Sequence, residues 1–156
     1  MTTEYQSLDR EGQFKAKPLS WNVYEAKSGA VAVNITFLIT AQWNGSAWDD
    51  WSEYTSTCPG AFYVVKKDGT INTVTVKQLA ESLNWKGDLK EFLDVPPEVE
   101  VQITVKAEDY NGMTFYKAGW INPGDHVPSY GASPEAVGKL NVRFGSLLRA
   151  AAAAKL

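Results

Sequence analysis

The sequence of 156 residues contains one cysteine, Cys58, and one histidine, His126. A single cysteine cannot form an intramolecular disulfide, which excludes a disulfide-stapled secreted domain and a metal site built from several cysteines. We therefore expect no metal and no other cofactor, and we expect the reducing environment of the cytoplasm. His126 lies in a segment rich in Pro and Gly, where we expect a bystander rather than a base or a ligand.

Long apolar segments and net positive charge are also lacking. No stretch approaches the roughly 18 consecutive apolar residues of a membrane span, and residues 1–10 lack the basic start and apolar run of a secretory signal. We therefore expect a soluble protein that does not bind membranes. The formal net charge of -3 excludes a uniformly basic surface. Because Lys and Arg supply most of the affinity for nucleic acid, any nucleic-acid site must be local.

Motifs of common enzymes are missing as well. The sequence has no Gly-rich phosphate-binding loop, no nucleophile elbow and no spaced pair of metal ligands. Asp49 and Asp50 are neighbours, so on a strand they would point to opposite faces and could not act together as acid and base. We expect a protein that is not an enzyme.

Aromatic residues, by contrast, are abundant: the chain has six Trp, seven Tyr and six Phe. Trp43, Trp48 and Trp51 fall close together, in a segment that we expect to be a loop or a loosely paired hairpin. We expect at least one of these three rings to lie in the core. The aromatic content is high for a globular protein, so we also expect some rings to act at the surface.

Alternation of apolar and polar residues predicts five strands. They cover residues 14–27 (with a bend at Pro18), 31–40, 61–67, 99–106 and 113–122. Between the third and fourth strands, Val76, Leu79 and Leu83 have helical spacing, which predicts a helix there. A second helix is predicted from Pro134 to near the end of the chain.

This order of elements predicts a mainly β fold, a five-stranded OB-like barrel with a helix between strands 3 and 4 and a C-terminal helix. A β-sandwich, the alternative, normally needs about seven short strands and no inserted helix. We expect a mobile N-terminal arm at residues 1–12 and the barrel at residues 13–123. Residues 124–156 are expected to be a loop and a helix that packs on the barrel or on a partner.

The Asn111-Gly112 dipeptide is the preferred two-residue turn of a β-hairpin, and it predicts the register of the last two strands. Counting outward from this turn assigns each residue to a face. One face holds Lys106, Glu108, Tyr110, Met113, Phe115 and Lys117, with the two lysines opposite one another. The other face, which we expect to serve the core, holds Val105, Ala107, Tyr116, Ala118 and Trp120.

Lysines beside exposed rings suit single-stranded nucleic acid, because phosphates take the charge and unpaired bases stack on the rings. We therefore predict a nucleic-acid site that includes Lys106, Tyr110, Phe115 and Lys117. The alternative is that both lysines are simply solvated and that Phe115 packs beneath the C-terminal helix.

A second candidate surface combines cations of the first strand with the Trp-rich segment, because in an OB barrel the neighbouring loops can border one groove. Its members are Lys15, Lys17, Trp43, Trp48 and Trp51. Three carboxylates in the same segment would repel phosphates and could instead keep the rings from binding non-specifically. They are Asp49, Asp50 and Glu53.

Short segments between residues 14 and 148 carry a family resemblance. They are Phe14-Lys-Ala16, Trp48-Asp-Asp-Trp51, Lys67-Asp-Gly-Thr-Ile-Asn72, Leu83-Asn-Trp-Lys-Gly87, Tyr110-Asn-Gly112, Trp120-Ile-Asn-Pro123 and Leu140-Asn-Val-Arg-Phe-Gly145. Together they resemble bacteriophage single-stranded DNA-binding proteins of the OB type. The resemblance implies a viral protein that coats single strands during DNA replication or recombination in the host cytoplasm.

The expected partner is single-stranded DNA, with RNA as the alternative. A second copy of the chain is a further candidate partner, through the apolar face of the C-terminal helix. Two other functions stay open. Trp rings also stack on sugars, as in a carbohydrate-binding module, and a Trp-rich loop would equally suit a protein-protein adaptor or a virion component.

Overall fold

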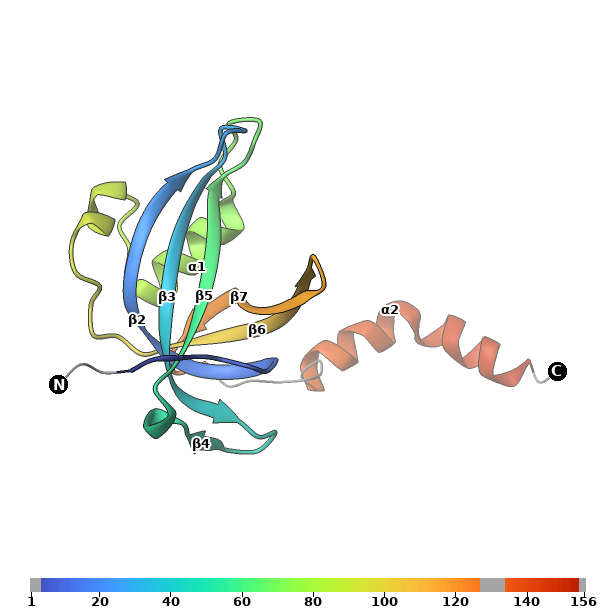
Figure 1. The fold of residues 1–156 in the computed structure, drawn as a ribbon. Helices are drawn as coiled ribbons and strands as arrows, with labels where there is room; N and C mark the ends of the chain where they lie inside the picture. Colours follow the sequence, from blue (N-terminus) through green and yellow to red (C-terminus); the bar gives the residue numbers. More distant parts are fainter. Residues whose placement is uncertain (1–3, 127–133, 155–156) are drawn as a thin grey trace. The chain divides into compact units, whose positions relative to one another are not determined.

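The computed structural model describes residues 4–126 and 134–154 (Figure 1). The chain divides into two compact units, Met1–His126 and Val127–Leu156. The second unit contains α2 (Pro134–Ala153), a helix of 20 residues. None of the described helices combines the length and the apolar character that crossing a bilayer requires.

Within the described residues, the first unit is built on a seven-stranded mixed sheet (Figure 1). The strands are β1 (Gln6–Ser7), β2 (Gly12–Glu25), β3 (Val31–Trp43), β4 (Trp48–Asp50), β5 (Ser56–Val65), β6 (Val101–Tyr110) and β7 (Met113–Pro123). Their order is β1-β5-β7-β6-β2-β3-β4, and a further pairing of β5 with β3 closes a ring of five strands. Three helices connect them: η1 (Ser52–Tyr54), α1 (Thr73–Leu83) and η2 (Leu89–Leu93). The prediction of a mainly β protein with a helix before the final hairpin is confirmed.

The ring closes where β5 runs parallel to β7, through the pairing of Gly60 with Ala118. A Cβ atom on Gly60 would lie 3.0 Å from the carbonyl oxygen of Ala118 and 3.1 Å from its Cβ. These distances are tighter than ordinary packing, so the close approach of the two strands requires a residue without a side chain. Gly60 therefore permits the closure.

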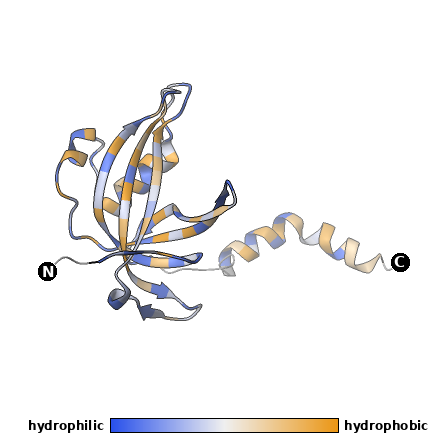
Figure 2. Cartoon of the chain, in the orientation of Figure 1, coloured by the Kyte–Doolittle hydropathy of each residue, from blue (hydrophilic) through white to orange (hydrophobic). Residues whose placement is uncertain are grey.

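The inward faces of the ring strands fill the interior. The largest fully buried side chains include Phe14, Ile35, Phe37, Ile39, Ile103 and Ile121. Each such side chain contributes roughly 1.5–3 kcal/mol when it leaves water. Figure 2 shows how the hydropathy changes from residue to residue along the strands. α1 begins after Asn72, which caps its first turn, and packs against β5 and β7 with Leu79 and Leu83 buried.

β2 is one continuous strand that runs through Pro18. Its register with β3 shifts between Lys15 and Ala16, and again between Pro18 and Ser20. Proline has no N–H to donate to the ladder, and an irregular pairing accommodates it inside a sheet. The bend expected at Pro18 corresponds to this irregularity within a single strand.

Residues 4–12 differ from the mobile arm expected at residues 1–12. β1 pairs in parallel with β5, and the side chain of Leu8 is buried in the core. The carboxylate of Glu11 accepts a hydrogen bond from the backbone N–H of Ala107 at 2.9 Å. Burial of Leu8 and pairing with the edge of β5 therefore order this segment, although most of its residues are polar.

The first unit also extends past residue 123, where we placed the end of the barrel. The side-chain amide of Gln102 donates hydrogen bonds to the carbonyl oxygens of Gly124, at 3.0 Å, and of His126. Gln102 itself is buried. Because a buried amide requires partners, these two bonds attach residues 124–126 to the sheet.

Candidate nucleic-acid interface

The turn of the β6–β7 hairpin has the geometry that its sequence predicts. Asn111 and Gly112 have φ angles of 52° and 79°, the left-handed values that a two-residue hairpin turn requires. The pairs Tyr110–Met113, Glu108–Phe115 and Lys106–Lys117 all form. The predicted register of the hairpin is confirmed.

The outer face of this hairpin presents rings and cations to solvent. Tyr110 is 67% exposed and Phe115 is 42% exposed. The Nζ of Lys117 lies 3.3 Å from Oε2 of Glu108. This ion pair partly neutralises Lys117, the lysine that stands opposite Lys106 across the hairpin. Among the described residues, Lys106 makes no ion pair, so it is the cation on this face that is free to meet a phosphate.

The opposite face of the hairpin serves the core only near its base. Val105 and Ala118 are buried and Tyr116 is half-buried, whereas Ala107 is exposed. The pairing of β6 with β2 ends at Val105, and beyond this residue β6 pairs with β7 alone within the described chain. The predicted core face is confirmed at the base and wrong at Ala107, because a two-stranded ribbon has no third strand to bury it.

Trp120 lies on the outer face, although simple alternation places it on the core face. Thr104 pairs with Trp120. The next residue, Val105, pairs with Ala118, which leaves Gly119 as an extra residue in β7. A bulge of this kind changes the face that the following side chains occupy. Trp120 is consequently 47% exposed, and the prediction that it serves the core is wrong.

The cation Lys15 and the rings of Trp43 and Trp48 form a second group. The Lys15 Nζ lies 5.0 Å from the centre of the Trp48 ring, and the Trp43 and Trp48 rings are 5.1 Å apart. Oε1 of Glu100 lies 3.8 Å from the same Nζ. Lys15 therefore already has an anion and a ring as neighbours. Lys17, also predicted for this surface, is half-buried on the same side of β2.

Trp51 is partly buried and packs against the core. Its ring lies edge-on to Phe14 at 6.4 Å, and its indole N–H donates a hydrogen bond to Oγ of Ser56 at 3.1 Å. The guanidinium of Arg10 lies 4.8 Å from the ring centre, and the Tyr54 ring lies 4.6 Å away. None of the three tryptophans is fully buried, so the expectation of a core member is met only in part, by the packing of Trp51 against the core. Packing on several sides leaves Trp51 little surface for stacking a base.

The two groups share one face of the sheet. Residues paired across neighbouring strands point to the same side. Lys15 pairs with Gln102, and Gln102 pairs with Asn122. Two residues earlier on β2, Gln13 pairs with Thr104, which in turn pairs with Trp120. The register thus places Trp120 on the outer face between the Lys15 group and the hairpin lysines.

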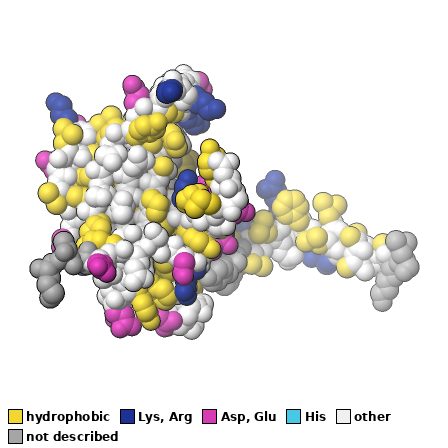
Figure 3. Space-filling view, in the orientation of Figure 1, with side chains coloured by type: hydrophobic (Ala, Val, Ile, Leu, Met, Phe, Trp, Pro, Cys, Tyr) yellow, Lys and Arg dark blue, Asp and Glu magenta, His cyan; other side chains and the backbone are white. Residues whose placement is uncertain are grey.

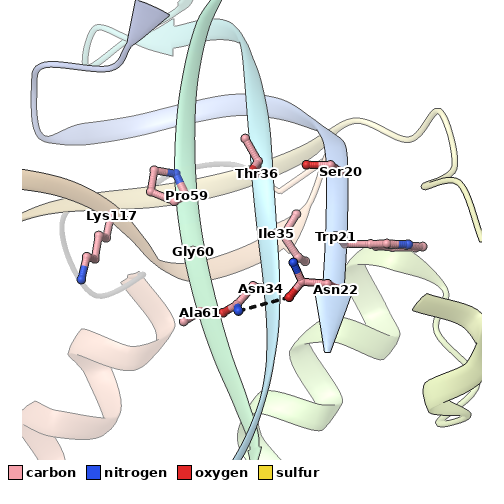
Figure 4. A pocket seen from close by; sticks show the side chains of 10 residues that line it. All are labelled: Ser20, Trp21, Asn22, Asn34, Ile35, Thr36, Pro59, Gly60, Ala61 and Lys117. Carbon is pink, nitrogen blue, oxygen red and sulfur yellow. Dashed lines mark hydrogen bonds between the residues drawn. The ribbon is translucent and has the colours of Figure 1, made fainter. Parts of the chain in front are cut away.

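A shallow pocket lies on the outer face of β2, β3 and β5, a surface to which sequence reasoning assigned no role (Figure 4). It is lined by Ser20, Trp21, Asn22, Asn34, Ile35, Thr36, Pro59, Gly60, Ala61 and Lys117. The amide of Asn34 donates to Oδ1 of Asn22 at 3.2 Å across β2 and β3. Lys117 comes to this pocket from β7. The sequence feature that could have indicated this pocket is the row of polar residues that alternate with buried ones along β3.

Tyrosines and lysines lie at one end of the outer face of β2, β3 and β5. Ala32 pairs with Tyr24 of β2 and with Tyr63 of β5, so the three residues form a row, and both tyrosines are exposed. Lys66 and Lys67 follow β5 and line an open pocket beside Tyr63. Figure 3 shows Lys or Arg side chains gathered at the end of the molecule where β5 and the β2–β3 turn lie. This end offers further cations next to rings.

Two carboxylates stand beside these rings and cations in the sequence: Asp50 ends β4 after Trp48, and Asp68 follows Lys66 and Lys67. The Ser52 hydroxyl and amide donate hydrogen bonds to Asp50 and lower the pKa of its carboxyl group. The hydroxyl and amide of Thr70 lower the pKa of Asp68 in the same way, and the positive charge of Lys66 adds to the effect. Both carboxylates keep their negative charge over a wider pH range as a result. The interface is therefore a mixed surface with local cations.

Cys58 and His126 are not part of this surface. Burial raises the pKa of the Cys58 thiol to about 12, and its Sγ lies 3.5 Å from the carbonyl oxygen of Tyr116. Such a thiol stays protonated and unreactive at neutral pH. The backbone of His126 accepts a hydrogen bond from Gln102.

Comparison with known proteins adds no family assignment. No protein-family model matches the sequence, and no curated protein matches it either. Any function has to follow from the residues of the chain itself.

Proposed function

We propose that this protein binds single-stranded DNA, largely independently of sequence and without catalysis, as an accessory of DNA replication or recombination. One observation carries the proposal. Lys117 belongs to two surfaces at once: it shares the outer hairpin face with Tyr110 and Phe115, and it lines the polar pocket of β2, β3 and β5. A strand of nucleotides could follow rings and cations continuously from one surface to the other.

The chemistry of the exposed groups favours unpaired over duplex nucleic acid. Bases that are not paired expose their faces, and each base that stacks on an aromatic ring gains roughly 1–3 kcal/mol. Tyr110, Phe115 and Trp120 are all more than 40% exposed on the hairpin side. Duplex DNA hides its base faces, and it would depend on phosphate contacts that an acidic protein with few local cations supplies poorly.

We further propose that the ring of five strands is an OB-type barrel. The long strands follow one another around the ring as β2, β3, β5, β7 and β6, and α1 lies between the third and the fourth in the chain. This is the strand count and helix position of an OB fold, whose strands 2 and 3 and adjoining loops bind oligonucleotides. β3 and β5, which hold the polar pocket, are the equivalents of those two strands.

A titration of a fluorescent oligo-dT of about 30 nucleotides, long enough for at least one OB site, tests the function. We expect saturable binding. The logarithm of the association constant should fall linearly with the logarithm of the salt concentration, with a slope of about 0.7 for each phosphate contact. An oligo-dT duplexed with oligo-dA should bind more weakly. The proposal is overturned if oligo-dT does not bind, or if binding is insensitive to salt between about 50 and 200 mM.

An oligosaccharide ligand is the second candidate, and the polar pocket is the observation that favours it. Asn22 and Asn34 present neutral amides there, beside the hydroxyl-bearing Ser20 and Thr36. Amides and hydroxyls suit sugar hydroxyls, and OB barrels also bind oligosaccharides. A glycan array that is positive while oligo-dT binding is absent would select this function. The reverse result would exclude it.

A further inference from the structure

We propose that α2 of one copy of this protein docks into an acidic apolar cleft on the first unit of a second copy. The inference does not rest on DNA binding, since it concerns protein-protein assembly alone. It combines two surfaces, a basic amphipathic helix and a cleft of the opposite charge.

The helix has an apolar face of regular spacing. Val137, Leu140, Phe144 and Leu147 are separated by three, four and three residues, so they lie along one side of α2, and all four are exposed. Side chains of this kind and spacing normally face another element of structure. The stretch from Val137 to Leu147 is about 15 Å long.

The polar side of the helix is basic. Residues 127–156 contain four Lys or Arg residues and one acidic residue, Glu135. Glu135 forms an ion pair with Lys139 at 3.4 Å, which leaves Arg143 and Arg149 as the uncompensated charges of the described helix. The remaining 126 residues have the opposite bias, with 17 acidic and 11 basic residues. The opposite charges of the helix and of the first 126 residues therefore favour contact between them.

The first unit contains a cleft that fits such a helix. The cleft, of about 450 Å³, is lined by Trp21, Leu83, Trp85, Val95, Pro97 and Val99, with Glu91 and Asp94 among its polar residues. Its border includes Val95, which is 89% exposed, and the neighbouring Leu93 is 84% exposed. Residues 81–98 contain five carboxylates and two lysines. An apolar floor beside acidic residues complements an apolar stripe that is flanked by Arg143 on a helix with a net positive charge.

Two identical helices suit each other less well. A pair of α2 helices would bring Arg143 of both chains beside one seam, and the one acidic residue of the helix, Glu135, already pairs with Lys139. Reciprocal exchange avoids this, because each copy gives a helix and receives one. The same contact then forms twice around a two-fold axis, the commonest symmetry of protein dimers.

Two charge-reversed variants test the contact by sedimentation velocity in the absence of DNA. D94K/E98K reverses the charge of Asp94, which lines the cleft, and of Glu98, which stands in the chain between the lining residues Pro97 and Val99. R143E/R149E reverses the charge of the helix. Asp94 and Glu98 make no side-chain ion pair among the described residues. We expect the unmodified protein to dimerise with increasing concentration. Each variant alone should dimerise at least tenfold more weakly, while circular dichroism stays unchanged.

Mixing the two variants gives the decisive measurement. The reversed helix of one then meets the reversed cleft of the other, and the unmodified pair of surfaces also forms, so we expect heterodimers at close to unmodified affinity. The control E4K/E53K changes net charge equally and should dimerise normally. The proposal is overturned by any of three results: an unmodified protein that stays monomeric, variants that dimerise normally, or a mixture of variants that stays monomeric. The third result would indicate that the helix docks on its own chain. None of these outcomes depends on whether oligo-dT binds.

Discussion

The β6–β7 hairpin and the Trp43–Trp48 hairpin both place lysine beside aromatic rings, yet their charges are arranged differently. Beside the Trp-rich hairpin of β3 and β4, Lys15 of β2 is paired with Glu100 and lies against the Trp48 ring. On the β6–β7 hairpin, Lys117 pairs with Glu108, but Lys106 makes no ion pair in the described part of the chain. Composition alone does not distinguish these two surfaces.

The difference shows what makes a ring available to a ligand. A ring that already packs on a neighbour, as Trp48 does on Trp43 and Lys15, must give up that contact before a base can replace it. Tyr110 and Phe115 need no such exchange because they are already exposed. If the protein binds DNA as proposed, we expect the β6–β7 hairpin to contribute the larger share of the affinity and the Trp-rich hairpin the smaller.

The largest effect should come from comparing Trp51 with Trp120. Trp51→Ala removes the contact with Phe14 and the hydrogen bond to Ser56, and should lower the free energy of unfolding by about 3 kcal/mol. Trp120→Ala, at an exposed site, should cost less than about 1 kcal/mol. Urea denaturation measures both. Equal losses of stability would contradict the division between an inner and an outer tryptophan.

The second test asks which rings stack on bases. Phe115→Ala should weaken oligo-dT binding by about 2 kcal/mol, or roughly 30-fold, because one stacking surface is lost. Tyr54→Ala is the control, since Tyr54 is about equally exposed but packs beside Trp51 on η1. Fluorescence titration at one salt concentration gives both values. If the two variants lose the same affinity, the hairpin is not the site.

The third test separates the two hairpins by their cations. Lys106→Ala should reduce the slope of log affinity against log salt by about 0.7, the contribution of one phosphate contact on a single strand. Lys15→Ala should change this slope less, because Glu100 already neutralises Lys15. Titrations at several salt concentrations measure the slopes. Equal changes would mean that the ion pair opens when DNA binds.

The smallest effect concerns Glu100 itself. Glu100→Gln removes the charge that pairs with Lys15 but can still accept the hydrogen bond from the Thr40 hydroxyl. It should raise affinity for oligo-dT by less than about fivefold, because half-exposed ion pairs contribute at most about 1 kcal/mol. A decrease in affinity at unchanged stability would show that Lys15 is held in place by Glu100 for binding.

Several parts of the fold follow from local pattern. Alternation in residues 31–40 predicts β3, and Asn111-Gly112 predicts the hairpin turn and three of its pairs, because turn type and side-chain period are local properties. The strands β1 and β4 do not follow from pattern. Each has at most three residues, too few for a periodic signal, and each forms because a neighbouring edge is available to pair with it.

The candidate site was predictable on one hairpin face and hidden elsewhere. The exposed positions of Tyr110 and Phe115 follow from counting, but the polar pocket depends on three strands meeting in register, which no short segment encodes. The sequence does not show which of Trp48 and Trp51 packs against the core. The contact of Trp51 with Phe14 is visible only in the structure.

The amino-acid sequence by itself determined that this is a mainly β chain with a defined hairpin register and with lysine and aromatic residues on one face. Tertiary structure decided the rest: that Gly60 lets β5 meet β7, that Trp51 turns inward, and that Gly119 turns Trp120 outward. The physical reason is the same in each case. Strand periodicity is local, whereas bulges, close approaches and burial depend on partners distant in the chain.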